Sequence, residues 1–267
     1  MPSVQELYEL FAGESDLEAE LGRSLDPRGR DWLFELFASL GPEPGQLVLD
    51  VGARDARHAI RLVREHGLRA VAVDPVPLHV ERAREAAAEA GLGDELEVVQ
   101  AGIESLPLAD ASVDWIWCRD VLPHVDQAQR IRECARSLRP GGRMLAYVTV
   151  ATEHLEPREA VELHEAVAVV PESMDAGALE ERAAAAGLEL LSVEELGGEW
   201  RERMIEDRAW DAGDALLRLS RLRRRRQELV EAYGQAAVDA YAGGTLWGIY
   251  QLLGKLRPTV YVWERRG

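Results

Sequence analysis

Short apolar strands alternate with helical segments through the centre of the chain, and this alternation limits the possible folds more than any other feature. Five short, mostly apolar runs predict strands, and residues at helical spacing separate most of them. The predicted strands are Leu47–Val51, Ala70–Val73, Leu96–Val99, Val113–Cys118 and Arg143–Val150, and the predicted helices are 55–66, 77–90 and 126–138. This order predicts an α/β fold, Rossmann-like and doubly wound, with a mostly parallel sheet and helices on both faces.

The flanking segments predict additions to that sheet. Helical spacing covers 4–21 and 28–40 at the start, and 156–168, 178–186 and most of 200–254 later in the chain. Leu188–Val193 and Pro258–Trp263 predict two closing strands, which brings the expected total to seven. Within 200–254, helix breaks are expected at Gly213, Gly234, Gly243, Gly244, Gly248 and Gly254.

We therefore expect a single domain over 1–267 with a helical insertion before the last strand. Its parts are an N-terminal helical cap over 1–40, a ligand-binding half over 45–150, and closing strands with a helical lid of about 200–254 over 151–267. A core of this size suits a chain of 267 residues that is 47% hydrophobic.

Composition excludes several classes of protein. The apolar runs are too short to span a membrane, and the acidic N-terminal segment does not match a secretory signal. Cys118 and Cys134 stand at no metal-ligand spacing, so we expect two reduced, buried thiols, no metal site and a cytoplasmic protein. The net charge of −17 argues against a nucleic-acid partner. One run, Arg221–Arg226, is basic in this otherwise acidic chain. We interpret it as a solvated helix face, and the alternative is a site that binds phosphate or acidic groups.

A strand that runs into a glycine turn predicts a binding site for an adenosyl ligand. The strand ends at Val51, Gly52 follows, and a helix begins a few residues later, where unpaired N–H groups face the ligand. Asp74 ends the next strand, 22 residues after Gly52. A carboxylate at this place accepts hydrogen bonds from ribose hydroxyls, and the alternative is that it caps the following helix.

Two further motifs complete a family pattern. They are the segment Gln100–Pro107, followed by Asp114–Trp117, and the turn Leu138–Gly142. Together with the glycine turn and Asp74, their order resembles the class I S-adenosylmethionine-dependent methyltransferases, in the small-molecule branch of type 11. The resemblance covers about 45–150 and extends more loosely over 188–263.

The resemblance implies S-adenosyl-L-methionine as cofactor and a set of contacts to it. Asp50 and Gly52 would lie at its amino-acid end and Asp74 at the ribose, and Ala53, Arg54 and Pro75 are also expected to bind it. The other implied contacts are Gly102, Ile103 and Glu104 at the adenine and Arg119 near the transferable methyl group.

The chain departs from the family pattern at the glycine turn and at the adenine. The second and third glycines are replaced by Arg54 and Ala56, and Gly102 stands where an acidic residue is often found. Arg54 either turns outward or pairs with the cofactor carboxylate through a charge-assisted bond.

The implied reaction is methyl transfer to O, N or C of a small-molecule acceptor. Such a reaction needs alignment, exclusion of water and, for some acceptors, a base. His124 and Asp120 follow the fourth strand and are the candidates, with His124 preferred because histidine titrates near neutral pH. His58 and His79 are expected to be exposed or to pack, and His154 and His164 stay open. Aromatic residues of the 200–254 lid, from Trp200 to Tyr250, suit an acceptor pocket, and the alternative is that they are core residues at helical spacing. The N-terminal Tyr8, Phe11 and Trp32 are expected to close the other side of the acceptor.

Three other functions were weighed. A degenerate fold that binds a nucleoside or a partner without catalysis stays open because of Arg54. A nicotinamide-dependent oxidoreductase is disfavoured by the missing G-x-G-x-x-G motif. A nucleic-acid methyltransferase is disfavoured by charge and by the lack of an Asn-Pro-Pro-aromatic segment after the fourth strand. Monomer and homodimer are equally compatible with the sequence.

Overall fold

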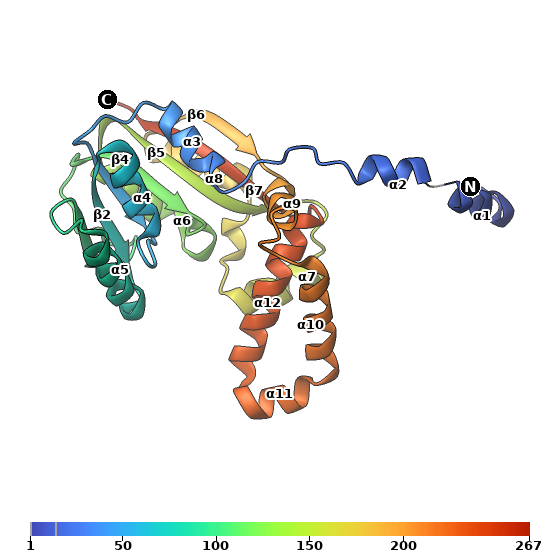
Figure 1. Cartoon of the computed structure of the whole chain (residues 1–267). Coiled ribbons are helices and arrows are strands. Elements are labelled where there is room, and N and C mark those ends of the chain that lie inside the picture. The colour runs from blue at the N-terminus through green and yellow to red at the C-terminus, as the bar shows by residue number, and fades with distance from the viewer. Residues whose placement is uncertain (1, 14) are drawn as a thin grey trace.

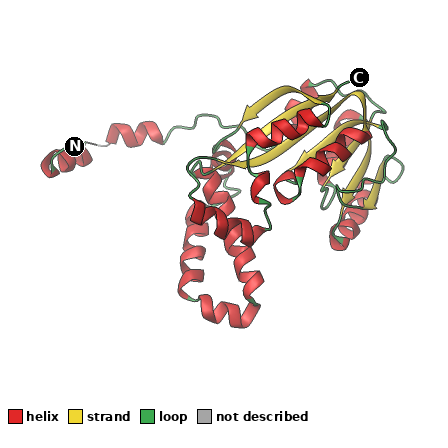
Figure 2. Cartoon of the chain, turned by 180° about the vertical axis from the view of Figure 1, so that it is seen from behind, coloured by secondary structure: helices red, strands yellow, loops and turns green. Residues whose placement is uncertain are grey.

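The computed structural model describes residues 2–13 and 15–267, in which one sheet is covered by helices on both faces (Figures 1 and 2). In the described residues the sheet has seven strands in the order β3-β2-β1-β4-β5-β7-β6, and β7 runs antiparallel to both of its neighbours. The strands are β1 (Leu47–Val51), β2 (Arg69–Asp74), β3 (Leu96–Gln100), β4 (Val113–Arg119), β5 (Leu138–Ala151), β6 (Leu188–Glu195) and β7 (Leu256–Arg265). The predicted α/β class and mostly parallel sheet are confirmed.

The helices confirm the expected alternation and divide the helical regions more finely. The described helices are α1 (Val4–Ala12), α2 (Ser15–Leu21), α3 (Trp32–Ser39), α4 (Arg57–His66), α5 (Pro77–Ala90), α6 (Gln127–Ser137), α7 (Pro157–Val167), α8 (Ala176–Ala185), α9 (Glu199–Glu206), α10 (Ala212–Arg224), α11 (Arg226–Tyr233) and α12 (Gln235–Leu252), with short 3₁₀ turns η1 (Leu122–His124) and η2 (Pro171–Ser173). In the part of the chain that the structure describes, no helix has the length and apolarity needed to cross a membrane.

Successive side chains of the strands enter two separate cores. One core lies under α3, α4 and α5, and the other lies under α6 and α8. Because both faces of the central strands are buried, these strands appear in the sequence as continuous apolar runs. Cys118 and Cys134 are buried and unpaired in the second core, as expected.

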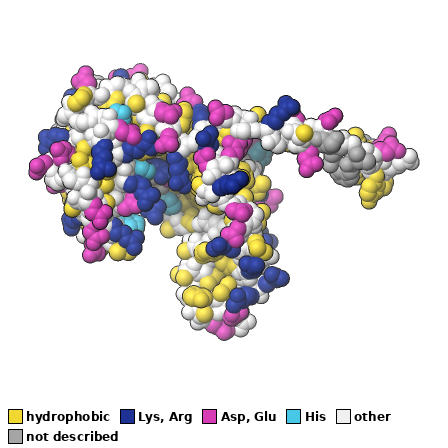
Figure 3. All heavy atoms as spheres, viewed as in Figure 1, with side chains coloured by type: hydrophobic (Ala, Val, Ile, Leu, Met, Phe, Trp, Pro, Cys, Tyr) yellow, Lys and Arg dark blue, Asp and Glu magenta, His cyan; other side chains and the backbone are white. Residues whose placement is uncertain are grey.

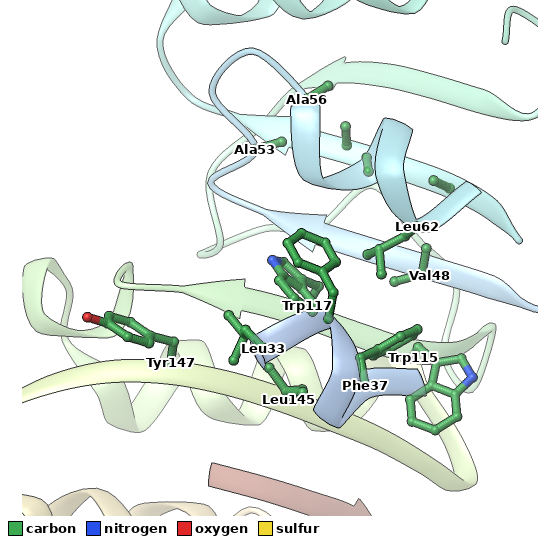
Figure 4. Packing of buried hydrophobic residues seen from close by; sticks show 14 of the residues in the cluster. Leu33, Phe37, Val48, Ala53, Ala56, Leu62, Trp115, Trp117, Leu145 and Tyr147 are labelled. Atoms are coloured by element: carbon green, nitrogen blue, oxygen red, sulfur yellow. The ribbon is translucent and has the colours of Figure 1, made fainter. Parts of the chain in front are cut away.

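Helix α3 is attached to the sheet by aromatic packing, which Figure 4 shows between Leu33, Phe37 and the two tryptophans of β4. The rings of Phe37 and Trp115 meet edge to face with centroids 5.0 Å apart, and Phe34 stacks on Trp117 at 4.8 Å. Each such pair contributes about 0.5–1.5 kcal/mol beyond the area that it buries. These contacts place α3 alongside β4, with its N-terminal end toward the carboxyl end of the strand.

Of the expected N-terminal helical cap, only α3 packs on the sheet. The predicted helix over 4–21 is two helices, α1 and α2, which extend away from the body and do not cover the sheet (Figure 1). Tyr8 is 70% exposed, so the expectation that it encloses an acceptor is wrong; the Phe11 side chain lies outside the described residues. The second predicted helix starts at Trp32 rather than residue 28. The cause is the non-helical segment 22–31, which contains Gly22, Pro27 and Gly29 and separates α2 from α3.

Helices α9–α12, which we call the helical arm, hang from one end of the sheet (Figure 1). Gly234 and Gly254 have positive φ angles at helix ends, as expected. The breaks expected at Gly213, Gly243, Gly244 and Gly248 are absent from the described structure, because α10 and α12 run through these positions. At Gly243 the reason is close packing, since a Cβ there would lie 2.6 Å from Ala166 Cβ in α7.

The fifth strand also begins earlier than expected. The segment Pro140–Gly142 was expected to form a tight turn before the strand, but β5 already begins at Leu138, and the register with β4 shifts between Val113 and Trp115. The extra residues are therefore accommodated as an irregularity within the ladder.

We expect Gly243→Ala to destabilise the protein by about 1–3 kcal/mol, because the added methyl group forces α7 and α12 apart. The matched control is Gly244→Ala on the same helix, where a Cβ meets nothing within 4 Å. This control should be neutral or stabilising by up to about 1 kcal/mol through helix propensity. Urea denaturation of both variants measures the difference, and equal free energies of unfolding would contradict the packing argument.

Candidate active site

The carboxyl ends of β1, β2 and β4 surround a cavity of about 610 Å³, which we call the strand-end cavity. Nine of the twelve predicted site residues line it, drawn from segments up to 74 positions apart in the chain. Its lining consists of Asp50, Gly52, Ala53, Arg54, Asp55, Arg57, His58, Asp74, Pro75, Val76, His79, Arg119, Asp120, Val121 and His124. Ligands of open α/β sheets bind at this edge.

The turn between β1 and α4 keeps a glycine-like backbone at all three positions of the family pattern. Gly52, Arg54 and Ala56 have φ angles of 70°, 52° and 54°, which lie in the left-handed region. A Cβ at Gly52 would overlap the Val121 side chain, so only glycine fits there. Arg54 and Ala56 adopt the same conformation with side chains present, at a cost of about 1–2 kcal/mol each.

Asp74 joins this turn to the start of α5. One carboxylate oxygen accepts the Arg54 backbone N–H at 2.9 Å, and the other accepts the Val76 N–H at 2.9 Å and lies 3.1 Å from His79 Nδ1. A carboxylate offers about four acceptor sites, and these contacts occupy three. Asp74 therefore accepts hydrogen bonds from the neighbouring backbone and keeps one acceptor site for a hydroxyl ligand. A second acceptor site becomes available if the His79 ring moves aside.

Asp50 lies at the floor of the cavity and is 2% exposed. Burial raises the pKa of its carboxyl to about 7, although the Ala59 N–H, 3.2 Å away, and the Arg119 guanidinium both favour the charged form. A carboxyl with this pKa titrates near neutral pH, which is typical of functional sites.

Comparison with known proteins agrees with this geometry. The model of a methyltransferase domain family matches residues 49–146, which include most of β1, all of β2, β3, β4 and α6, and most of β5. Residues 49–146 thus match a methyltransferase domain. The resemblance seen in the sequence and the predicted fold are thus confirmed.

Named relatives and solved structures extend the comparison. An uncharacterized methyltransferase of Mycobacterium tuberculosis is 41% identical over 128 residues, which are 47% of this chain and 46% of that protein. A 27-O-demethylrifamycin SV methyltransferase of Amycolatopsis mediterranei is 35% identical over 38% of this chain and 37% of its own length. This chain thus spans less than half the length of these curated relatives. A protein of Galdieria sulphuraria described as a sarcosine dimethylglycine methyltransferase has a TM-score of 0.68 and 22% identity, covering 88% of this chain and 84% of that one.

Arg119 and His58 form one wall of the cavity in the methyltransferase domain. Arg119 Nη1 lies 3.5 Å from His58 Nε2, and the His58 ring packs against Phe34 and Trp117. Burial, followed by the charge of Arg119, lowers the pKa of His58 to about 4, so this ring is neutral at pH 7. Its packing role was expected, but its place in the cavity was not.

His79 was missed for the same reason as His58. Both belong to the first turns of the helices that follow β1 and β2, and the first turn of such a helix lies at the carboxyl edge of the sheet. This position in the chain was the signal that could have identified them.

The two candidate bases differ in their surroundings. Asp120 has a φ of 56°, its carboxylate accepts the Thr149 N–H at 3.0 Å, and burial raises its pKa. His124 is exposed, and its Nδ1 lies 3.2 Å from the Ala168 carbonyl oxygen. Because a carbonyl only accepts hydrogen bonds, Nδ1 carries the proton in this contact and Nε2 keeps a free lone pair.

The three residues predicted at the adenine do not line the strand-end cavity. Ile103 is buried in the second core, and Gly102 and Glu104 lie in the turn after β3, where the Glu104 carboxylate folds back against Gly102. Their contact with an adenine therefore stays a prediction, and it requires the β3–β4 segment to line an extension of the cavity.

The helical arm contributes some of the expected aromatic residues and not others. Trp200 packs on Tyr147 with ring centroids 5.1 Å apart, and Trp247 faces His124 at 6.1 Å. Tyr233 and Tyr241 instead line a separate cavity among α10, α11 and α12. The Arg221–Arg226 run is exposed at this end of the arm, as expected for a solvated helix face.

We expect Arg54→Gly to raise the free energy of unfolding by up to about 1 kcal/mol. The substitution removes the left-handed penalty of about 1–2 kcal/mol, and the greater backbone freedom of glycine in the unfolded chain offsets part of it. Chemical denaturation without ligand measures this change. A marked loss of stability would show that the Arg54 side chain makes a compensating interaction.

Proposed function

We propose that this protein transfers a methyl group from S-adenosylmethionine to O, N or C of a small-molecule acceptor. The observation that carries the proposal is the strand-end cavity, in which Asp50, the Gly52 turn and Asp74 meet at the carboxyl edge of β1 and β2. The matched family and the rifamycin methyltransferase among the relatives support the same reaction class.

The residues present fit this donor. A cavity of about 610 Å³ lies within the usual range for small-molecule sites, about 300–1,000 Å³. The absence of a side chain at Gly52 exposes backbone, Asp50 offers a carboxylate to an amino group, and Asp74 lies where ribose hydroxyls bind in this fold. When bound, the donor supplies a methyl group already activated on a sulfonium.

The chain's own part in the reaction is alignment, exclusion of water and proton transfer. The Trp200, Tyr147 and Trp247 rings place apolar surface beside Arg119 and His124, where an acceptor meets the cavity. His124 Nε2 accepts the proton of an acceptor that must lose one, and Asp120 positions the end of β4 through Thr149. We also propose that the helical arm and the sheet act as one domain.

An alternative function is favoured by one observation. Arg54 puts a charged side chain at the second glycine position of the turn, so the fold could bind a nucleoside or a partner without transferring a methyl group. Ligand binding and methyl transfer therefore have to be measured separately.

Calorimetric titration with S-adenosylmethionine and with S-adenosylhomocysteine tests the proposal. We expect saturable binding of both and at least a tenfold loss of affinity in Asp74→Ala, which removes a charge-assisted acceptor. Asp126→Ala is the matched control, because Asp126 caps α6 through the Ala128 N–H as Asp74 binds the Val76 N–H, away from the cavity. Absence of heat with either compound would refute the function. Binding without transfer of tritiated methyl groups to any metabolite extract would favour the non-catalytic alternative.

The affinity for S-adenosylhomocysteine should rise as the pH increases from 6 to 8. Burial raises the pKa of Asp50 to about 7, so its carboxyl loses the proton over this interval and then attracts the cationic amino group of the ligand. Asp50→Asn should bind more weakly at pH 8 and show a flatter pH profile. A wild-type affinity that does not change with pH would place the amino group elsewhere.

A further inference from the structure

Three arginines gather beside the strand-end cavity although the chain carries a net charge of −17. They are Arg30 before α3, Arg119 at the end of β4 and Arg201 in α9, and we call them the arginine cluster. Figure 3 shows Lys and Arg side chains concentrated in the hollow between the sheet and the helical arm. The concentration of one sign of charge in a hollow attracts ligands of the opposite sign.

Two members of the arginine cluster converge on a single sulfur atom. Arg30 Nη2 lies 3.6 Å from Met204 Sδ, and Arg201 Nη1 lies 3.7 Å from the same atom. A thioether is a weak acceptor, whereas a guanidinium carries five donors suited to carboxylate or phosphate oxygens. Both side chains therefore present charged donors to one point without an anion to receive them.

Nearby arginines show that carboxylate partners are available in this region. Arg28 pairs with Glu199 at 2.7 Å, and Arg203 pairs with Asp207 at 3.2 Å. Within residues 2–13 and 15–267, the arginine cluster forms no ion pair with any carboxylate. The lack of a carboxylate partner thus distinguishes the arginine cluster from Arg28 and Arg203, which lie close to Arg30 and Arg201 in the sequence.

Arg119 and Arg201 are held in place by neutral groups. Arg201 Nε donates to Gln251 Oε1 at 2.7 Å, and Gln251 Nε2 donates to Thr149 Oγ1 at 3.2 Å. Gln251 and Thr149 are both buried. Arg119 lies 5.4 Å from the Trp200 ring centroid, and its buried Nε has no hydrogen-bond partner among the described residues.

The electrostatics agree with this geometry. Burial lowers the pKa of Arg119 and of Arg201; Tyr147 and Asp120 raise both pKa values, and the positive charge of Arg30 lowers both. The acids that face the cluster are Asp50 and Asp120, and burial raises the pKa of both, which reduces their capacity as counterions. The three guanidinium groups thus outnumber the two acids that face them.

We propose that Arg30, Arg119 and Arg201 form a subsite for an oxyanion, a carboxylate or a phosphate group, on the methyl acceptor. This inference rests on the proposed function, because it assigns the class of acceptor to the same site. Arg119 joins the two regions, since it lines the strand-end cavity and lies over the ring of Trp200, which precedes Arg201 in α9. Cationic amines are disfavoured as acceptors by the same charge.

Calorimetry with simple probes tests the subsite on protein saturated with S-adenosylhomocysteine. Benzoate and phenyl phosphate are the anionic probes, and benzamide is the neutral probe of the same shape. We expect at least one anionic probe to bind, with an affinity that falls as salt is raised, and at least a tenfold weaker affinity in Arg201→Met. Arg30→Gln, at an exposed position, is a second variant that should weaken the same binding. Arg158→Gln, which removes an exposed arginine paired with Glu162, is the control and should change nothing.

The outcomes separate the two proposals. Equal binding of benzamide and benzoate, or anion binding that survives both Arg201→Met and Arg30→Gln, overturns the subsite. Displacement of the anion by S-adenosylhomocysteine, or a weaker affinity for that compound in Arg201→Met, also overturns it, because the cluster would then hold the cofactor's own carboxylate. If S-adenosylhomocysteine does not bind to the wild-type protein, the proposed function fails, and anion binding to the free protein still tests the charge of the subsite.

Discussion

The contact between the Arg54 backbone and the Asp74 carboxylate is the constraint on which the site depends. It joins the turn after β1 to the end of β2, and the N–H groups of Gly52 and Ala53 reinforce it by donating to the Val73 carbonyl. Together these bonds hold a left-handed turn that two of its three residues do not favour intrinsically. These hydrogen bonds thus offset the cost of the left-handed turn, which leaves the backbone at Gly52 accessible from the cavity.

The second constraint is the attachment of the helical arm to the sheet. Trp200 packs on Tyr147, and the buried pair Gln251 and Thr149 connects Arg201 to the strand that also anchors Asp120. A buried polar chain of this kind is stable only when each member finds a partner, so it specifies how the arm meets the sheet. The position of Arg201 relative to Arg119, which lines the cavity, follows from that attachment.

Much of the fold, and the place of Gly52 and Asp74 at the carboxyl edge of the sheet, followed from local patterns. The strands β1, β2, β4 and β5 were found because they are mostly apolar runs buried on both faces, and the edge strand β3 was found from a shorter apolar run. Gly52 and Asp74 were found because the turn and the strand end have a recognisable spacing. The prediction failed where a residue's role depends on a distant segment. Gly243 was read as a helix break, yet it lies within α12 because Ala166 of α7 requires the space.

The sequence by itself determined most element types, the alternation of strands and helices along the chain and the position of the glycine turn, because these follow from periodicity, backbone preference and chain connectivity. Only the tertiary structure decided that His58 and His79 line the cavity and that α1 and α2 extend away from the sheet. It also decided that three arginines have no carboxylate partner among the described residues. The reason is physical: burial and Coulomb interactions depend on distances between segments far apart in the chain, and no local pattern encodes those distances.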